Sequence, residues 1–412
     1  MTVEKRRPPR GGASPAPVED RAGVRRIVTR LAAVVVAVAA ALTLSRHGFI
    51  DLNVYRVAGQ AYLDGVGLYG AEFHTRSSLS YIYGPVGAVA MVPLALVPQL
   101  VTQVLWTALG VAVLWWVLRT VCDRLGLAST SATALLLLTP AVLVGPVRDT
   151  LGYGQINLLL MGLVVLDATG VLPKRFRGVG IGLAAAVKMT PAAFGLLLVV
   201  RKDYPSVVRA AGAFLLAGAA GFVFAPADSR EYWTVVFFDT GRGGSYRYGP
   251  NQAITGILAR MGLVEPTATV VWLGAVVLVV AAAAYAARKF TASGEHVLAL
   301  GVVALAALLA SPLSVSHHWV YVALLLPLLL APQYRSWRYP LAGAAIVYFL
   351  SLHNEVPMSG ERELHWNPVQ QVLGNSEGVV GMALLVAAVV VAHRRRPALA
   401  TDVTAVERVV QP

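Results

Sequence analysis

Apolar runs that are long enough to cross a lipid bilayer, or nearly so, recur along this 412-residue chain. A full crossing takes roughly 20 apolar residues in a helix, because every backbone polar group in the hydrocarbon has to be bonded inside the protein. With 57% hydrophobic and 13% charged residues, the chain has too little polar surface for a soluble protein. We predict an all-α integral membrane protein, a multi-pass bundle of about 12 helical segments. The runs are 27–45, 85–118, 127–145, 156–170, 178–200, 207–226, 266–287, 296–311, 318–331, 339–351 and 377–392.

The basic residues lie at the chain ends and in short links between these runs, and they give a formal net charge of +13. Such links mark the cytoplasmic side of a multi-pass protein, where they also face anionic lipid headgroups. No basic patch is interleaved with aromatic residues, so nucleic acid is not an expected partner. We predict a disordered basic cytoplasmic tail at 1–26, a transmembrane domain at 27–392 and a cytoplasmic tail at 393–412.

The same orientation leaves several segments on the extracytoplasmic side, provided that 85–118 makes one net crossing and that 178–200 is a hairpin of two short arms. The hairpin would turn near Lys188, where "KMTP" interrupts the apolar run. Most of the unusual polar and aromatic residues fall outside, so we expect a site on that face. The longer outer loops are 46–84, 227–265 and 352–376, and the shorter outer segments are 146–155 and 311–318.

Asp51 stands at the mouth of the first span, in "SRHGFIDLNVYR". In one interpretation it is a loop carboxylate that pairs with Arg46 or Arg56, or that caps the following helix. In the other it is partly desolvated, with a raised pKa that suits a general base. The residues that follow, Leu52–Leu63, could form an amphipathic helix along the membrane interface.

Lys188 lies within an apolar run, where a cation is costly. It either reaches to the membrane surface or meets a buried anion, and a phosphate would be such an anion. Gln155 and Asn157 start another apolar run in "GYGQIN". They are either helix caps or neutral hydrogen-bonding groups for sugar hydroxyls.

Tyr81 and Tyr83 end the first outer loop, either as interfacial aromatic residues or as groups that stack on a sugar ring. His317 and His318 follow a serine-rich stretch and are plausible donors to a phosphate or a hydroxyl. Adjacent helical residues diverge by about 100°, and no further ligands lie at zinc-like spacing. The single cysteine, Cys122, allows neither an internal disulfide nor a cysteine metal site. We therefore expect neither a metal nor a cofactor.

Asn251 and Gln252 begin the motif "NQAITG", which follows a glycine-rich loop. This loop is either an ordinary flexible loop or a lid over a long substrate. The chain has no phosphate-binding loop, no dinucleotide fingerprint and no Asp-x-Asp pair. A donor with a single lipid-linked phosphate needs fewer countercharges than a sugar nucleotide does, and a lysine or a histidine can supply them.

The ordered motifs "NVYR", "YIYGP", "GYGQINLLL", "KMTP", "NQAITG" and "SPLSVSHHWVY" resemble those of the GT-C glycosyltransferases, and most closely those of glycosyltransferase family 87. They span residues 47–321, most of the chain. The resemblance implies a GT-C type helical bundle in the plasma membrane with a catalytic first outer loop. It also implies a monomer that needs no cofactor and works among membrane lipids.

The resemblance further implies an inverting mannosyltransferase. The donor would be polyprenyl-phosphate β-mannose, the acceptor a phosphatidylinositol mannoside and the product an α-1,2 linkage. Asp51 would be the general base. The residues expected to bind the donor phosphate or sugar are His317, His318, Lys188, Tyr83, Gln155 and Asn157, and those expected at the acceptor or in a lid are Tyr55, Arg56, Tyr81, Asn251 and Gln252.

Two alternatives remain open. A lipomannan mannosyltransferase or an arabinofuranosyltransferase would share this architecture and differ only in its donor sugar and acceptor. A polyprenol or glycolipid transporter would instead show inverted repeats and polar residues in mid-membrane. Lys188 is the only clear residue of that kind.

Overall fold

The computed structural model describes residues 18–45, 47–358 and 361–395. The described chain is helical, and its only β pairing is an isolated antiparallel bridge between Asn251 and Val315. The predicted all-α class is therefore confirmed. Residues 1–17 and 396–412, which belong to the two predicted tails, lie outside the described residues.

Five described helices are long and apolar enough to span a bilayer: α1 (Val18–Ser45), α4 (Gln99–Arg124), α10 (Tyr204–Phe224), α13 (Thr267–Ala292) and α18 (Ser376–Arg394). Large apolar side chains on these helices point away from the protein, as with Leu215, Leu216 and Val223 of α10. Exposed leucines and valines in such number would be unfavourable in water but are suited to lipid. Helix α1 starts at Val18, so residues 18–26 are helical although they were predicted to be part of a disordered tail.

Several predicted spans are interrupted at proline or glycine. The run 85–118 divides into α3 (Pro85–Ala95) and α4, with Pro98 just before α4. Helix α5 (Thr130–Leu143) meets α6 (Gly145–Tyr153) at an angle of 76°. Proline cannot donate a backbone hydrogen bond in a helix, and Pro146 at the start of α6 accordingly begins a new helix after the bend.

The run 178–200 contains α8 (Val179–Val187), a 3₁₀ turn η2 (Thr190–Phe194) and α9 (Gly195–Val200). Its two ends lie together, because Arg177 Nη1 is 3.6 Å from Asp203 Oδ2 and Arg209 Nε donates to the Arg177 carbonyl at 2.8 Å. A segment that leaves and returns at one place is a hairpin. These contacts agree with the predicted hairpin and with its turn at Lys188.

The other predicted runs also coincide with helices, although the predicted count of about 12 segments stays a prediction. These helices are α7 (Asn157–Ala168), α14 (His296–Ala310), η6 (Val320–Leu324) with α15 (Leu325–Leu330), and α16 (Arg338–Leu350). The predicted outer segments contain α2 (Ile50–Asp64), α11 (Pro226–Thr234), α12 (Ile254–Arg260), η5 (Ser316–His318) and α17 (Pro368–Gly374) as well as α6.

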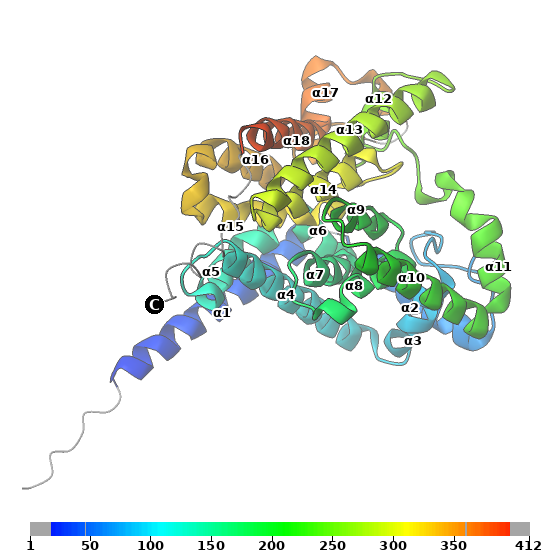
Figure 1. Ribbon diagram of the computed structural model, residues 1–412. Coiled ribbons are helices and arrows are strands. Elements are labelled where there is room, and N and C mark those ends of the chain that lie inside the picture. Colours follow the sequence, from blue (N-terminus) through cyan, green and yellow to red (C-terminus); the bar gives the residue numbers. More distant parts are fainter. Residues whose placement is uncertain (1–17, 46, 359–360, 396–412) are drawn as a thin grey trace, which may run out of the picture.

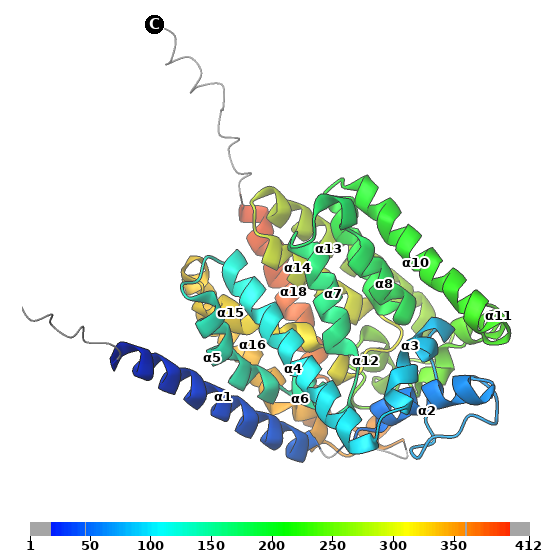
Figure 2. The same cartoon turned by 90° about the horizontal axis from the view of Figure 1, so that it is seen from below.

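The helices pack as a bundle in which α13 contacts α14 and α18, α4 contacts α5 and α7, and α8 lies along α10 (Figure 1). In the perpendicular view, α2 and α6 lie toward one end of the bundle and the C-terminal end of α18 lies toward the other (Figure 2). Helix α2 is amphipathic, as predicted, and packs its apolar face on α3. A Cβ at Gly59 would come within 2.7 Å of the Met91 carbonyl oxygen, which shows how closely the two backbones approach.

Candidate active site

Asp51 lies in the first turn of α2, and the start of this helix is fixed by the turn that joins α6 to α7. The Phe49 amide donates to the Gly152 carbonyl at 2.9 Å. Gly154 has a left-handed φ of 68°, and a Cβ on it would lie 2.6 Å from Cβ of Leu52. Glycine is thus needed twice here, for its backbone conformation and for the close approach of α2. The turn fixes the position of the carboxylate.

Burial raises the pKa of Asp51 from 3.8 to about 6. Removing a carboxylate from water penalises its charged form. The positive charge of Lys188, a hydrogen bond from the Gln155 side chain and the charge of His47 favour the charged form and keep the pKa from rising further. A carboxylate with this pKa is ionised near neutral pH and is a stronger base than an exposed one.

Tyr55, Tyr83 and Gln155 form a buried hydrogen-bonded cluster next to Asp51. The Tyr55 hydroxyl donates to Gln155 Oε1 at 2.8 Å and lies 3.1 Å from the Tyr83 hydroxyl. Gln155 Nε2 lies 3.2 Å from the Tyr83 hydroxyl. The structure therefore brings together three predicted site residues from the first outer loop and the α6–α7 turn. Their bonds fix the Gln155 amide that contacts Asp51.

Lys188 lies at the C-terminal end of α8, where the hairpin breaks. Its Nζ donates to Asn157 Oδ1 at 3.1 Å and lies 2.9 Å from His318 Nε2. An ammonium group has no acceptor lone pair, so beside charged Lys188 the His318 Nε2 atom accepts and its proton is on Nδ1. The ammonium also lies 5.8 Å from the centre of the Tyr83 ring. Lys188 thus joins the tyrosine cluster to the histidine pair.

The turn that carries His317 and His318 is held from two directions. The His317 carbonyl accepts hydrogen bonds from Thr150 Oγ1 at 2.7 Å and from Asn157 Nδ2 at 2.8 Å. Burial and, to a smaller extent, the charge of Lys188 lower the pKa of His317 to about 3. The imidazole is therefore neutral near pH 7, and its ring lies 4.7 Å from the ring of Tyr153.

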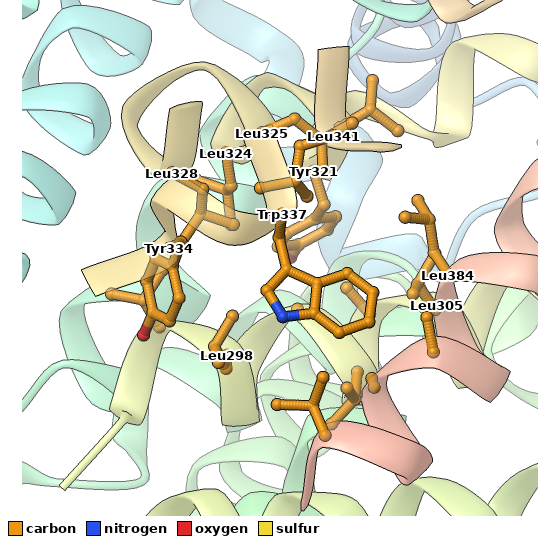
Figure 3. Close-up of a pocket in the computed structure, with 18 of the residues that line it drawn as sticks. Leu298, Leu305, Tyr321, Leu324, Leu325, Leu328, Tyr334, Trp337, Leu341 and Leu384 are labelled. Carbon is orange, nitrogen blue, oxygen red and sulfur yellow. The ribbon is translucent and has the colours of Figure 1, made fainter. Parts of the chain in front are cut away.

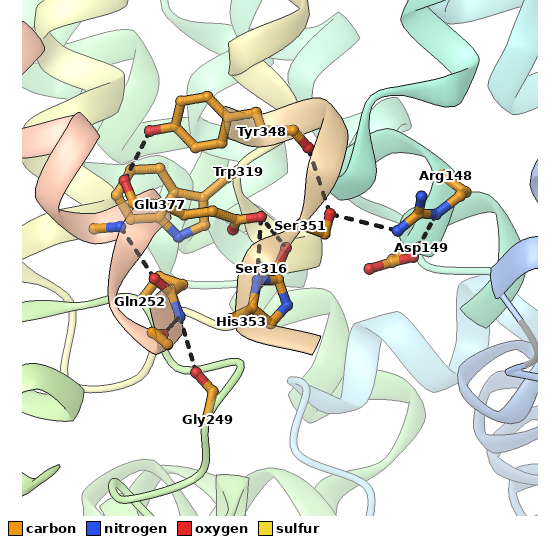
Figure 4. A network of polar contacts seen from close by, with 12 residues as sticks. Arg148, Asp149, Gly249, Gln252, Ser316, Trp319, Tyr348, Ser351, His353 and Glu377 are labelled. Atoms are coloured by element: carbon orange, nitrogen blue, oxygen red, sulfur yellow. Dashed lines mark hydrogen bonds and ion pairs between the residues drawn. The ribbon is translucent and has the colours of Figure 1, made fainter. Parts of the chain in front are cut away.

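A wholly buried carboxylate, Glu377 of α18, supports this turn from behind (Figure 4). Its Oε1 accepts from Ser316 Oγ at 3.1 Å and lies 3.4 Å from His353 Nδ1. The Tyr348 hydroxyl donates to the Glu377 carbonyl at 3.0 Å. Since Ser316 directly precedes the histidine pair, this network sets where the two rings lie.

Asn251 and Gln252 belong to the same scaffold and not to the site. Both are fully buried, and Asn251 forms the bridge to Val315. Gln252 Nε2 donates to the carbonyls of Gly249 and Gly374, each at 2.8 Å (Figure 4). The interpretation of "NQ" as part of a mobile lid therefore disagrees with the structure. The Asn251 side chain accepts a hydrogen bond from the Ser314 amide, so it connects the segment after the glycine-rich loop to the residues just before His317.

Two other candidates also lie away from the reacting groups. Tyr81 is 1% exposed, and its hydroxyl bonds to the carbonyl of Gly84 at 3.2 Å, so it packs within the first outer loop. Arg56 is partly exposed on α2. Its Nη1 is buried and has no hydrogen-bond partner among the described residues. The Tyr81 ring nevertheless packs beside the Tyr83 ring, with centroids 5.6 Å apart.

A cavity of about 690 Å³ opens beside Lys188 and His318. Its polar lining includes these two side chains with Tyr83, Arg242 and Asp239, and Arg242 also donates to the Tyr69 carbonyl at 2.8 Å. The rest of the wall is mainly apolar, with residues from η2, α9, α13 and α14. A phosphate attached to a long apolar chain would match both ends.

A second cavity, of about 150 Å³, lies among α14, α15, α16 and α18 (Figure 3). Tyr321, Tyr334 and Trp337 are among its lining residues, and no charged side chain lines it. It therefore offers no carboxylate, histidine or lysine for acid–base chemistry. In the part of the chain that the structure describes, no three His, Cys, Asp or Glu side chains are grouped to hold a metal ion. The expectation of a metal-free reaction stays a prediction.

Sequence reasoning missed three residues near the site: Asp149, Arg242 and Glu377. Asp149 is 5% exposed, with Arg148 Nε at 3.2 Å and His47 Nε2 at 3.7 Å, so the outer segments hold a second, nearly buried carboxylate besides Asp51. The signal was present in "RDTLGYGQIN", where an Arg–Asp pair directly precedes the amide motif. Glu377 could have been noticed as an acidic residue at the start of an apolar run.

The chain is similar to proteins that act on lipid-linked mannose. A Mycolicibacterium smegmatis protein named polyprenol-phosphate-mannose-dependent alpha-(1-2)-phosphatidylinositol mannoside mannosyltransferase is 37% identical over 316 residues, which cover 70% of each chain. The Mycobacterium tuberculosis protein of the same name is 35% identical, over 70% of this chain and 71% of that protein. A second M. smegmatis protein, named as a phosphatidylinositol pentamannoside mannosyltransferase, is 31% identical over 77% of this chain and 78% of its own length.

A family model also matches residues 81–312, more than half of the chain. The match includes Tyr83, Gln155, Asn157 and Lys188, whereas the histidine pair lies just beyond its end and Asp51 lies 30 residues before its start. This chain is an enzyme that belongs to glycosyltransferase family 87.

Proposed function

We propose that the chain transfers mannose from polyprenyl-phosphate β-mannose to a phosphatidylinositol mannoside and forms an α-1,2 linkage. The observation that carries the proposal is the single network in which a carboxylate of raised pKa, Asp51, lies near the ammonium of Lys188 beside a largely apolar cavity. The base, the countercharge and the space for a lipid tail are the three parts that such a transfer needs. The names of the mycobacterial relatives support mannose as the sugar.

In the proposed reaction, the Asp51 carboxylate takes the proton from the acceptor hydroxyl while that oxygen attacks the anomeric carbon of the donor. The bond from this carbon to the phosphate oxygen breaks, and the phosphate leaves with the electron pair. Attack from the face opposite the phosphate converts the β-mannoside to an α-mannoside. One carboxylate base is enough for this displacement, whereas the usual glycosidase mechanism uses two facing carboxyl groups.

Lys188 would stabilise the charge that develops on the departing phosphate. Arg242, at the same end of the cavity, would add a second positive charge. His318, whose Nε2 is engaged by Lys188, would offer its Nδ1–H, and Tyr83 would line the donor sugar site. Gln155 and Asn157 would act mainly by holding Asp51 and Lys188, since their amides bond to these side chains.

The proposed location is the plasma membrane, with the site on the extracytoplasmic side. The distribution of basic links supports this orientation. We also propose that the enzyme acts as a monomer and without a metal ion.

The test is transfer by the purified enzyme from labelled polyprenyl-phosphate mannose to phosphatidylinositol mannosides of graded size. Asp51→Asn should be produced and folded like the wild type but transfer no mannose, and near-normal transfer by this variant would refute its role as the base. Because one relative is named for a pentamannoside acceptor, the series should include acceptors on both sides of that size. Transfer of labelled arabinose from its own lipid donor would overturn the sugar assignment.

A further inference from the structure

A second group of polar and aromatic side chains adjoins Asp51, and the proposed mechanism does not use it. This outer cluster consists of His47, Arg148, Asp149, Tyr153 and Tyr248. The His47 ring stacks on the Tyr153 ring, with centroids 3.7 Å apart and planes 9° apart. The side chains of Tyr153 and Tyr248 hydrogen-bond to each other. Three separate segments, before α2, in α6 and before α12, thus converge at one place.

Asp149 contacts two other members of the outer cluster, and Figure 4 shows it beside one of them, Arg148. Its Oδ1 lies 3.2 Å from Arg148 Nε and 3.7 Å from His47 Nε2, while a further nitrogen of Arg148 donates to Ser351 Oγ at 3.4 Å. The carboxylate is nearly buried, but exposed fractions of 29% for the His47 side chain and 44% for Tyr248 show that the cluster has an open side.

The outer cluster lies next to the base but is separate from the proposed phosphate site. The negative charges of Asp51 and Asp149 both act on Tyr153, so this ring is near both carboxylates. The charges of Lys188 and Asp149 both act on His317, whereas the charges that act on Asp149 itself are those of Arg148 and His47. The ring of His317 lies 4.7 Å from the ring of Tyr153 and 4.8 Å from that of His318, whose Nε2 is 2.9 Å from Lys188 Nζ, so the histidine pair lies between Lys188 and the cluster.

The chemistry of the cluster suits a neutral polyol and not a phosphate. Arg148 Nε lies 3.2 Å from Asp149 Oδ1, so the guanidinium charge is already compensated and is not free to hold a phosphate. The group still offers a carboxylate acceptor, guanidinium donors, an imidazole and two phenol hydroxyls, with aromatic surface beside them. Sugars present the matching pattern, hydroxyls that both donate and accept around an apolar ring face.

We propose that the outer cluster binds the terminal sugar of the acceptor and aims its hydroxyl at Asp51. This rests on the proposed function, because an acceptor exists only for a transferase. A two-substrate displacement needs a second site at the base, and that site has to lie apart from the phosphate and lipid tail of the donor. The outer cluster adjoins the base and meets this condition among the described residues.

The test separates the two substrates. Asp149→Asn and Tyr248→Phe should each raise the KM for the phosphatidylinositol mannoside about tenfold or more, the loss of one good polar contact. They should leave the KM for polyprenyl-phosphate mannose within about twofold. Asp64→Asn is the matched control, since Asp64 is exposed on α2 and its carboxylate accepts a hydrogen bond from the Gln60 amide. A rise in the donor KM, or no change in the acceptor KM, would overturn the proposal.

A binding measurement keeps the outcome independent of turnover. Saturation-transfer NMR with a soluble methyl dimannoside should show contact with the wild-type enzyme in detergent and none with Asp149→Asn. If Asp149→Asn does not fold, His47→Gln and Tyr248→Phe carry the test, because both side chains are partly exposed. Wild-type protein that binds the dimannoside but transfers no mannose would refute the proposed function and leave the sugar site standing. If the wild type transfers mannose and all the variants bind the dimannoside as the wild type does, the sugar site is refuted and the proposed function stands.

Discussion

The raised pKa of Asp51 leads to a specific prediction for the pH dependence of transfer. A general base acts only when it is deprotonated. Because the folded-state pKa is about 6 where an exposed aspartate has 3.8, activity should be present above pH about 6 and should be lost as the pH falls through that value. The loss should be a single acid limb in kcat/KM, which reports the free enzyme.

The size of the effect follows from the pKa. With a pKa of about 6, about nine tenths of Asp51 is ionised near pH 7 and about one tenth near pH 5, so kcat/KM should fall about tenfold between them. An aspartate of ordinary pKa would lose only about one twentieth of its ionised form over the same range. The two cases are easily separated in one experiment with labelled donor in detergent or in nanodiscs.

Gln155→Leu provides the structural test of the cause. Its amide bonds to the charged form of Asp51 and so lowers the pKa. Removing the amide should raise the pKa further and move the acid limb to higher pH. Gln60→Leu is the matched control, because Gln60 lies on the exposed face of α2 and bonds to Asp64 instead. A rate that stays flat down to pH about 5, or a limb that Gln155→Leu leaves in place, would refute the assignment of the limb to Asp51.

Three further predictions concern the support of the site. Lys188→Met should raise the donor KM about tenfold or more through the lost charge on phosphate, and it should also move the acid limb upward, since Lys188 lowers the pKa of Asp51; steady-state kinetics would show both. Glu377→Leu should lower the free energy of unfolding by about 1–3 kcal/mol, because it leaves buried polar partners unsatisfied. A variant with the same melting temperature as the wild type would contradict this. Gly154→Ala should cost about 1 kcal/mol or more and reduce kcat, because a left-handed residue gains a Cβ that meets Leu52; thermal unfolding and initial rates check both effects.

The helices could largely be predicted from hydropathy, since a span is long and its signal is summed over many residues. The hairpin at 178–200 also followed from the requirement that basic links stay on one side, and the contact between Arg177 and Asp203 agrees with it. Hydropathy could not predict the bend between α5 and α6. The hydropathy summed over an apolar run does not depend on where in the run a proline interrupts the helix. Residues 146–153 consequently read as an outer loop and are a helix.

The sequence indicated several of the residues that the structure brings together but not their contacts. Asp51, Lys188 and the histidine pair were each recognisable as costly residues at unusual places, and these are gathered in the structure. Asn251 and Gln252 look equally unusual in the sequence, yet they are fully buried in the scaffold. An amide that bonds to the backbone in the protein interior and an amide that binds a ligand look the same in the sequence. Only the fold shows which of the two roles a given residue has.

Most of the groups proposed to act in the reaction come from places where a helix is broken. Asp51 follows the junction of α1 and α2, the Gln155–Asn157 segment joins α6 to α7, Lys188 ends α8, and His318 lies between α14 and η6. A broken helix at membrane depth leaves backbone groups without partners, and this is tolerated only where protein or a cavity surrounds them. Here side chains satisfy some of those groups, as Thr150 and Asn157 do for the His317 carbonyl. The same polar groups are then available to a substrate. Short apolar runs ended by glycine or proline are therefore a better guide to the active site of such a protein than any single residue in it.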